Sequence, residues 1–252
     1  MIAHDFPVTN PSIDVDVKSS SVTLHRGPAG TVTVEVDTKH PDDWTVTDDG
    51  DTIVVRDDRG GWRVRSGSSR VRITAPDGSA ARITTASGDV VVTVATGRTE
   101  ISTASGDVRV AIAAALTVKT ASGDIAVDRV TSDVAAKTAS GDINAHEVGG
   151  DFEASTASGD IRVDTVGGAL RVNTASGDVR IGRFEGATLQ ANTVSGDVSV
   201  GIPSGRSVDL DVKTLSGSVR LPDRRGAAAE PPTKRVDIRV KSVSGDFSLA
   251  RA

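Results

Sequence analysis

The stretch Thr156–Asn173, TASGDIRVDTVGGALRVN, contains the pattern that decides the fold. It divides into two halves of nine residues, TASGDIRVD and TVGGALRVN, that resemble each other. Apolar and polar residues alternate strictly at the end of each half, in Ile161–Asp164 and in Leu170–Asn173. Such alternation is the signature of a strand with one buried face. Each half therefore predicts one short strand and one turn.

The phrase that opens this stretch, Thr-Ala-Ser-Gly-Asp, recurs nine times between Thr85 and Asp246, with drifted copies toward the end. Its first six glycines, at positions 88, 106, 123, 141, 159 and 177, are separated by 18, 17, 18, 18 and 18 residues. A fixed period in this range is typical of a repeat architecture. Frequent glycine, together with Val, Ile and Thr at the strand positions, excludes a helical repeat. The sequence predicts an all-β protein, a parallel β-helix or β-solenoid with coils of about 18 residues and two short strands per coil. The preference of parallel crossovers predicts a right-handed coil.

Successive coils are expected to stack in chain order, with each strand pairing in parallel with the same strand one coil on. The core then consists of columns of equivalent side chains, and a one-residue slip would turn each column outward. The first column contains Val90, Val108, Ile125, Ile143, Ile161, Val179, Val198, Val219 and Phe247. The second contains Val92, Val110, Val127, Ala145, Val163, Ile181, Val200, Leu221 and Leu249. A third, on the opposite strand, includes Leu116, Val134, Phe152, Leu170 and Leu189.

A single domain with three parts is expected. Residues 1–79 alternate like strands without the regular phrase, which predicts irregular first coils or a cap, because terminal repeats are atypical and shield an open edge. Residues 80–221 form the regular repeats. Residues 222–252 contain a loop rich in proline, Pro222–Thr233, and a final coil, Val236–Leu249.

Composition excludes several classes of function. The formal net charge of -5 and the absence of a clustered basic surface argue against a nucleic-acid partner. The absence of cysteine excludes disulfides, thiolate metal sites and a cysteine nucleophile. Aromatic residues make up only 2% of the chain, which argues against stacking sites for sugars or single strands. Trp44 and Trp62, outside the repeat, are predicted to be local core residues.

Hydropathy predicts no insertion into a membrane. The longest apolar run, near Val110–Val118, is too short to span a bilayer. The first residues, Met1–Pro7, lack a basic segment followed by an apolar core, which predicts no secretory signal. These patterns predict a cytoplasmic protein.

The repeated aspartates are the strongest candidates for a metal site. They are Asp89, Asp107, Asp124, Asp142, Asp160, Asp178 and Asp197, and stacking places them in one row. Like charges about 4.8 Å apart repel by roughly 1 kcal/mol in water, so something must offset the repulsion. Hydrogen bonds from turn amides would do so, and a bound cation would also do so. Calcium-binding β-rolls use nine-residue half-repeats of the form G-G-x-G-x-D-x-U-x, whereas the turns here lack the extra glycines. Structural turns are therefore the favoured interpretation, and no metal ligand and no cofactor are predicted.

The repeated serines could suggest a nucleophile. They are Ser87, Ser105, Ser122, Ser140, Ser158, Ser176 and Ser195. A nucleophilic serine needs a base within reach, and only one histidine, His146, lies in the regular repeat. No G-x-S-x-G elbow surrounds any serine, and no Walker or dinucleotide-binding glycine pattern occurs. His146 is expected to be an exposed strand residue, and the pair Asp164 and Glu153 is not specific enough to indicate a glycosidase. No catalytic residue is predicted.

The recurrent T-A-S-G-D-[IV] phrase with intervening G-G-x-[LF] resembles the DUF4097 β-strand-repeat proteins, also called "putative adhesins". The resemblance covers residues 80–250 closely and the N-terminal region loosely. It implies a single-stranded β-helix or solenoid. It supplies no catalytic residues, and the family name implies adhesion.

Three functions remain open. The first is a non-enzymatic scaffold or interaction module that binds a protein partner, or a second copy, through the faces or ends of the solenoid. The second is a β-roll stabilised by calcium. The third is a β-helix enzyme acting on polysaccharide, which would need a unique polar cluster and an aromatic groove. The uniformity of the repeat favours the scaffold, and the protein is not expected to be an enzyme.

Overall fold

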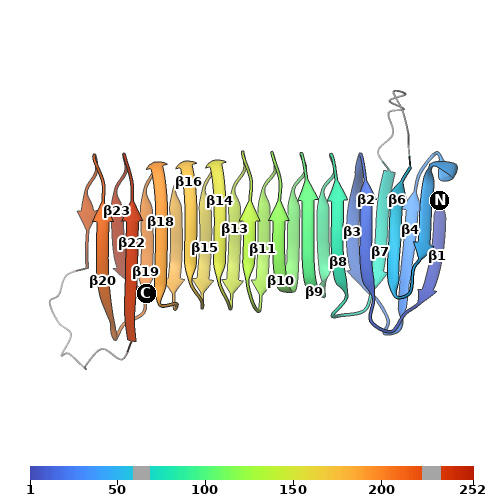
Figure 1. Ribbon diagram of the computed structural model, residues 1–252, viewed down its shortest axis with the longest axis horizontal. Helices are drawn as coiled ribbons and strands as arrows, with labels where there is room; N and C mark the ends of the chain where they lie inside the picture. The colour runs from blue at the N-terminus through green and yellow to red at the C-terminus, as the bar shows by residue number, and fades with distance from the viewer. Residues whose placement is uncertain (59–68, 223–233) are drawn as a thin grey trace. The chain divides into compact units, whose positions relative to one another are not determined.

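The computed structural model describes residues 1–58, 69–222 and 234–252. The chain forms two compact units, Met1–Ala126 and Val127–Ala252, called unit 1 and unit 2 below. The described residues of both units are organised almost entirely as β-strands (Figure 1). Trp62 and most of the expected Pro222–Thr233 loop lie outside the described residues.

Unit 2 is a parallel β-solenoid in which each coil contributes one strand to each of two series. In spatial order, the first series contains β13 (Ile143–Val148), β15 (Ile161–Val166), β17 (Val179–Phe184), β19 (Val198–Ile202), β23 (Phe247–Arg251) and β21 (Val219–Arg220). The second contains β12 (Val134–Lys137), β14 (Phe152–Ser158), β16 (Leu170–Ser176), β18 (Thr188–Ser195), β22 (Lys234–Lys241) and β20 (Arg206–Lys213).

The register of unit 2 follows the repeat. Ile143 pairs with Ile161, and Ile161 pairs with Val179, so equivalent residues of successive coils face one another. On the second series, Phe152 pairs with Leu170 in the same way. All these apolar side chains are buried, as the alternating pattern requires. The predicted all-β solenoid with two short strands per coil is therefore confirmed. The handedness of the coil and the boundaries of the three predicted parts stay predictions.

Coil order departs from chain order at the end of unit 2. The last coil in the sequence, β22–β23, lies between the coil β18–β19 and the coil β20–β21. Figure 1 shows β20 beyond β22, although β20 comes earlier in the chain. The expectation of stacking in strict chain order is wrong here. The sequence pattern permits the two coils to exchange places because both have the same alternation of apolar and polar residues. Val219 of one coil and Phe247 of the other fit the same column of the core.

Unit 1 begins with less regular strands. They are β1 (Ile2–Pro7), β2 (Ser12–Val17), β3 (Ser20–Arg26), β4 (Thr31–Asp37), β5 (Trp44–Asp48), β6 (Thr52–Asp57) and β7 (Ser69–Ala75), with a 3₁₀ turn, η1 (Pro41–Asp43), before β5. The regular strands that follow are β8 (Ala80–Thr85), β9 (Val90–Thr103) and β10 (Val108–Lys119), and β11 (Ile125–Val130) contains the boundary between the units.

The coil β2–β3 is also displaced from chain order. Strand β2 pairs in parallel with both β6 and β8, and β3 pairs in parallel with both β7 and β9. Three pairings in this region are antiparallel, those of β1 with β4, β4 with β7 and β5 with β6. Among the described residues of unit 1, the antiparallel strands β1 and β5 end the two series. Trp44, at the start of β5, is 8% exposed and belongs to the core.

The turn glycine of the repeated phrase permits close stacking. Gly159 has φ of +147°, and a Cβ atom added to it would lie 2.1 Å from the carbonyl oxygen of Gly141 in the preceding coil. A real Cβ atom cannot approach a backbone oxygen so closely, and L side chains rarely adopt this φ. The phrase therefore keeps glycine because of contact between neighbouring coils.

Candidate functional site

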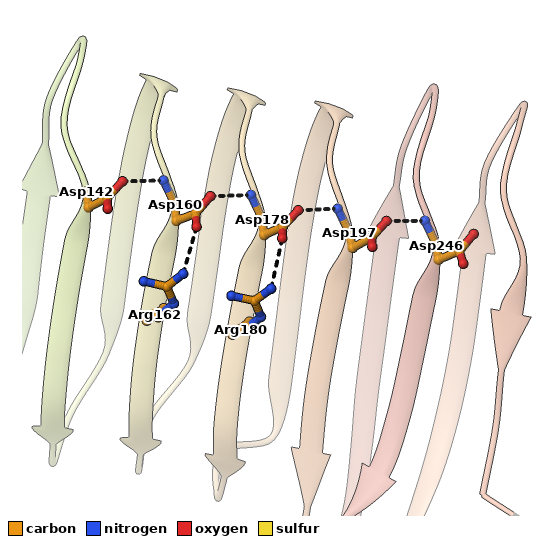
Figure 2. A network of polar contacts seen from close by, with 7 residues as sticks. All are labelled: Asp142, Asp160, Arg162, Asp178, Arg180, Asp197 and Asp246. Atoms are coloured by element: carbon orange, nitrogen blue, oxygen red, sulfur yellow. Dashed lines mark hydrogen bonds and ion pairs between the residues drawn. The ribbon is translucent and has the colours of Figure 1, made fainter.

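The aspartates of the repeated phrase form a hydrogen-bonded ladder in unit 2, called the aspartate ladder below (Figure 2). Each Oδ1 atom accepts a hydrogen bond from the backbone N–H of the corresponding residue in the next coil. The donors are Asp160 to Asp142 at 2.8 Å, Asp178 to Asp160 at 2.9 Å, Asp197 to Asp178 at 2.9 Å and Asp246 to Asp197 at 2.8 Å. One oxygen of each accepting carboxylate is thus bound to a backbone amide.

Two of the remaining oxygens face arginines. Arg162 Nη2 lies 2.8 Å from Asp160 Oδ2, and Arg180 Nη2 lies 3.0 Å from Asp178 Oδ2. Figure 2 shows each arginine reaching back to the aspartate two residues before it. A hydrogen-bond donor or a cation beside a carboxylate attracts its negative charge and so opposes repulsion between neighbouring carboxylates. These contacts offset the repulsion within the row.

Unit 1 contains the same arrangement. The backbone N–H of Asp107 donates to Asp89 Oδ1 at 3.1 Å, and that of Asp124 donates to Asp107 Oδ1 at 3.1 Å. Sequence reasoning anticipated amide bonds as one explanation of the row. It did not anticipate that the donor would be the next aspartate of the row itself.

A second ladder lies at the other turn of the coil and was missed. The backbone N–H of Asp151 donates to Asp133 Oδ1 at 2.8 Å, and that of Ala169 donates to Asp151 Oδ1 at 2.7 Å. A signal was present in the sequence, because Asp133 and Asp151 are 18 residues apart and each precedes a strand.

The aspartate ladder ends at Ser218 in the outermost coil of unit 2. Ser218 occupies the phrase position of aspartate, and its backbone N–H donates to Asp246 Oδ1 at 2.8 Å. This bond lowers the pKa of Asp246 below its ordinary value of 3.8, assisted by the Ser218 side chain and by the charge of Arg220. Because serine has no carboxylate, Ser218 cannot accept the ladder hydrogen bond from the backbone N–H of a further coil. The row therefore terminates where the stack of unit 2 terminates.

The ladder does not converge on a metal centre in the described part of the chain. Among those residues no group of three or more His, Asp or Glu side chains could hold a metal ion. Calcium takes six to eight oxygen ligands, whereas each ladder turn contributes one aspartate. The absence of a specific metal role for the row stays a prediction.

In unit 2 the candidate serines Ser158 and Ser176 and the candidate histidine His146 belong to strands of different series. The two serines are the last residues of β14 and β16. The carbonyl of Ser158 accepts a hydrogen bond from the N–H of Gly141 at 3.1 Å, and that of Ser176 accepts one from the N–H of Gly159 at 3.0 Å. His146, an exposed residue of β13, has its Nδ1 2.6 Å from Oδ2 of Asp164 on β15. Glu153 lies on β14, in the other series, and pairs with Lys137 at 3.3 Å. Asp164 and Glu153 thus lie on strands of different series, and each carboxylate is paired with a different basic residue.

Exposed apolar side chains gather at one corner of unit 2. The second position of the phrase is alanine in the first six copies and becomes Val194, Leu215 and Val243 in the last three. These three side chains are 54%, 86% and 47% exposed. The pairing of Ser244 with both Ser195 and Ser216 places Val243 between Val194 and Leu215. We call these three residues the apolar ridge. The replacement of alanine by larger apolar residues is visible in the sequence, but sequence analysis did not predict an exposed apolar surface from it.

A shallow groove of about 450 Å³ runs beside the apolar ridge across β14, β16, β18 and β22. Its lining includes the outward phrase residues Ala157, Ala175, Val194 and Val243, and the polar residues Ser155, Asn173, Asn192 and Lys241. The amide of Asn192 donates to Asn173 Oδ1 at 2.9 Å. The groove thus combines apolar side chains with hydrogen-bonding groups and one cation.

The outermost coil of unit 2 leaves its apolar side chains partly uncovered. Val219 is 45% exposed and Leu221 is 56% exposed, whereas their equivalents Val198 and Val200 in the inner coil β18–β19 are buried. A cavity of about 420 Å³ opens there, lined by Val208, Leu210, Leu221, Pro222, Leu249 and flanking polar residues. We call this surface, together with β20, the C-terminal edge. Within the described residues β20 pairs with β22 only.

The described residues include no helix with the length and apolar character needed to cross a bilayer.

Comparisons with solved structures support the fold. A "putative adhesin" from Bacteroides fragilis NCTC 9343 is similar over 98% of this chain and 96% of its own, with 15% identity and a TM-score of 0.51. A "putative lipid binding protein" from Parabacteroides distasonis ATCC 8503 is similar over 100% of this chain and 96% of its own, with 16% identity and a TM-score of 0.52. At such identities the likeness concerns the fold alone. No curated protein matches the sequence.

The repeated phrase, the paired parallel strands and the ladder turns agree with a family model. The model described as Toastrack DUF4097 matches residues 10–250, nearly the whole chain, and the protein therefore belongs to the Toastrack DUF4097 family.

Proposed function

We propose that the protein is a non-catalytic scaffold that binds a protein partner through the C-terminal coils of unit 2. The observation that carries this proposal is the position of the exposed large apolar residues. In the described part of unit 2 they are Val194, Leu215, Val219, Leu221 and Val243, all in the last three coils of the stack. Apolar side chains gathered on a surface, bordered by polar residues, are typical of interaction sites.

The polar residues of the repeat support a scaffold over an enzyme. The ladder carboxylates accept backbone bonds, and the phrase threonines Thr156, Thr174 and Thr193 are buried in the core. Every such residue occurs once per coil, whereas a catalytic group acts as part of one unique cluster. The name of the similar adhesin-like structure belongs to that protein, but it is compatible with a binding role here.

A comparative capture experiment tests the proposal. The full chain and a variant with Val194→Ser, Val243→Ser and Leu215→Ser would be used as bait in an extract of the source cell. The control is Ile112→Ser, which removes a 42% exposed apolar side chain from unit 1. We expect a partner captured by the natural chain and by the control to be lost with the ridge variant. Equal capture by all three proteins would contradict the proposal.

A cytoplasmic location is part of the proposal as a prediction. Fractionation of source cells, with detection of the untagged chain, tests it, and recovery of the protein outside the cytoplasm would contradict it. A partner would then have to be sought in that other compartment.

A further inference from the structure

We propose that the C-terminal edge of unit 2 pairs with the same edge of a second copy of this chain, so that two β20 strands run antiparallel in a twofold-symmetric dimer. The inference rests on the proposed function, since it names the occupant of one surface in the same coils. It concerns β20 and the partly uncovered core, whereas the partner site proposed above is centred on the apolar ridge.

In the described part of unit 2, β20 lies at an edge of its series. Strand β20 has eight residues, Arg206–Lys213, and each of them is paired to β22 on one side. Along its other side the described residues supply no strand. Backbone N–H and C=O groups on such an edge are a template for another strand. Two β20 strands would satisfy these groups in each other.

The core of unit 2 is incompletely covered at β20. Val208, Leu210 and Val212 of β20 are only partly buried, whereas Val236, Ile238 and Val240 of the adjacent β22 are at most 1% exposed. The core thus continues into β20 but lacks a covering layer there. A second copy of the same edge presents the same apolar residues, and burying them removes apolar surface from water in both copies.

The end of the aspartate ladder favours an antiparallel neighbour for β20 over a further parallel coil. In a further parallel coil, the backbone N–H at the phrase position would need a carboxylate acceptor in the coil before it. Ser218, which occupies that position in the outermost coil, has no carboxylate. An antiparallel strand places a different part of the coil beside that turn and does not need the ladder. Unit 1 shows that this chain ends its strand series with antiparallel strands, as β1 does on β4 and β5 does on β6.

The sequence of β20 suits a twofold axis. The segment Val208–Val212, VDLDV, reads the same in both directions about Leu210. With Leu210 on the axis, it faces Leu210 of the second copy, and Val208 faces Val212. The outward Asp209 would face Asp211 of the second copy, but each has its own cation. Asp209 forms an ion pair with Arg235, and Asp211 lies 3.7 Å from Lys213.

A single introduced cysteine tests this geometry, because the chain has none of its own. Residues directly opposite in antiparallel strands have Cα atoms about 4.5 to 5.5 Å apart, within the range that a disulfide bridges. We expect Leu210→Cys to form a disulfide-linked dimer on mild oxidation of the full chain. The matched control Glu153→Cys, an exposed position in the middle of unit 2, should cross-link at least about tenfold more slowly. Equal rates would overturn the proposal.

Light scattering after size exclusion, over a series of protein concentrations, supplies the second measurement. The natural chain should pass from monomer to dimer mass and no further, because a twofold interface closes on itself. Val208→Lys should raise the dimer dissociation constant at least about tenfold, since it places a charge in the buried contact. A cooperative thermal unfolding transition of the Val208→Lys variant at high dilution shows that its monomer still folds. A monomer at every concentration, or a series of growing oligomers, would overturn the proposal.

The two proposals fail separately. If the natural chain stays monomeric while partner capture still depends on the apolar ridge, only the dimer is wrong. If the Leu210→Cys dimer forms but the ridge variant captures the partner normally, only the partner site is wrong.

Discussion

At the scale of the residue, the repeated phrase is explained by five structural roles in one turn. In unit 2 the threonine points into the core, and the alanine or its larger replacement points outward. The serine carbonyl accepts a hydrogen bond from the backbone N–H of the phrase glycine in the preceding coil. Glycine allows the coils to approach, and aspartate binds the backbone of the following coil. Its repetition therefore follows from stacking and needs no repeated chemistry.

Substitutions of Asp178 can distinguish the contribution of its hydrogen-bond acceptor from that of its charge. Asp178→Ala removes the acceptor for the N–H of Asp197 and should lower the free energy of unfolding by about 1 kcal/mol. Asp178→Asn keeps a carbonyl acceptor and loses only the charge, and an ion pair as exposed as that with Arg180 contributes little. We expect the asparagine variant to lose less than half as much. Urea unfolding measures both values, and equal losses would show that charge is the decisive property.

Asp246 should make the stability depend on pH. Its folded-state pKa lies below 3.8 because of the Ser218 amide, the Ser218 side chain and Arg220. A lowered pKa stabilises the fold above the unfolded-state value, and that contribution is lost as pH falls through the folded-state value. The difference in stability between the natural chain and Asp246→Asn should thus shrink as pH falls from about 5 to about 2.5. Melting curves across that range check it, and a difference that stays constant would contradict it.

Gly159 should tolerate no side chain. Gly159→Ala places a Cβ atom against the Gly141 carbonyl and should cost at least about 2 kcal/mol of stability. Gly205, with φ of +78° and open space around it, is the matched control, and Gly205→Ala should cost about 1 kcal/mol or less. Thermal unfolding of the two variants separates crowding from backbone strain, and similar losses would show that crowding is unimportant.

At the scale of the element, the inner strands were predictable and the outer ones were not. The alternation in Ile161–Asp164 fixes which face is buried, and the 18-residue period fixes the partner, so the inner register of unit 2 followed from the sequence. The order of β20–β21 and β22–β23 did not follow, because both coils carry compatible columns and only long-range packing selects between them. The aspartate row was recognised, but its donor depends on how neighbouring coils stack and was not predicted. The row at Asp133 and Asp151 and the apolar ridge had signals in the sequence that were not interpreted.

The order of the coils can be tested with two separate variants, each of which introduces an aspartate at an equivalent position of the same column. Val198 lies in an inner strand and is 1% exposed, so Val198→Asp should cost at least about 4 kcal/mol. Val219 occupies the same column in the outermost coil, and Val219→Asp should cost less than about 1 kcal/mol in dilute solution. If both variants unfold equally easily, β21 is not at the end of the stack.

At the scale of the whole molecule, the two units share one turn chemistry and differ in their terminal strands. Unit 1 ends its series with the antiparallel strands β1 and β5. The described residues of unit 2 end with β20 and β21, where apolar side chains are exposed. A stack of repeats needs capping at its terminal coils, and an uncovered terminal coil leaves apolar surface that another chain can cover.

The claim that underlies this account is that the aspartate rows serve folding and hold no specific cation. The melting temperature of the full chain, measured in EDTA and then in millimolar calcium, tests it most directly, because a ligand that binds only the folded state must raise that temperature. We predict the same melting temperature in both solutions. A clear rise with calcium that EDTA reverses would contradict the account and favour a calcium-stabilised β-roll.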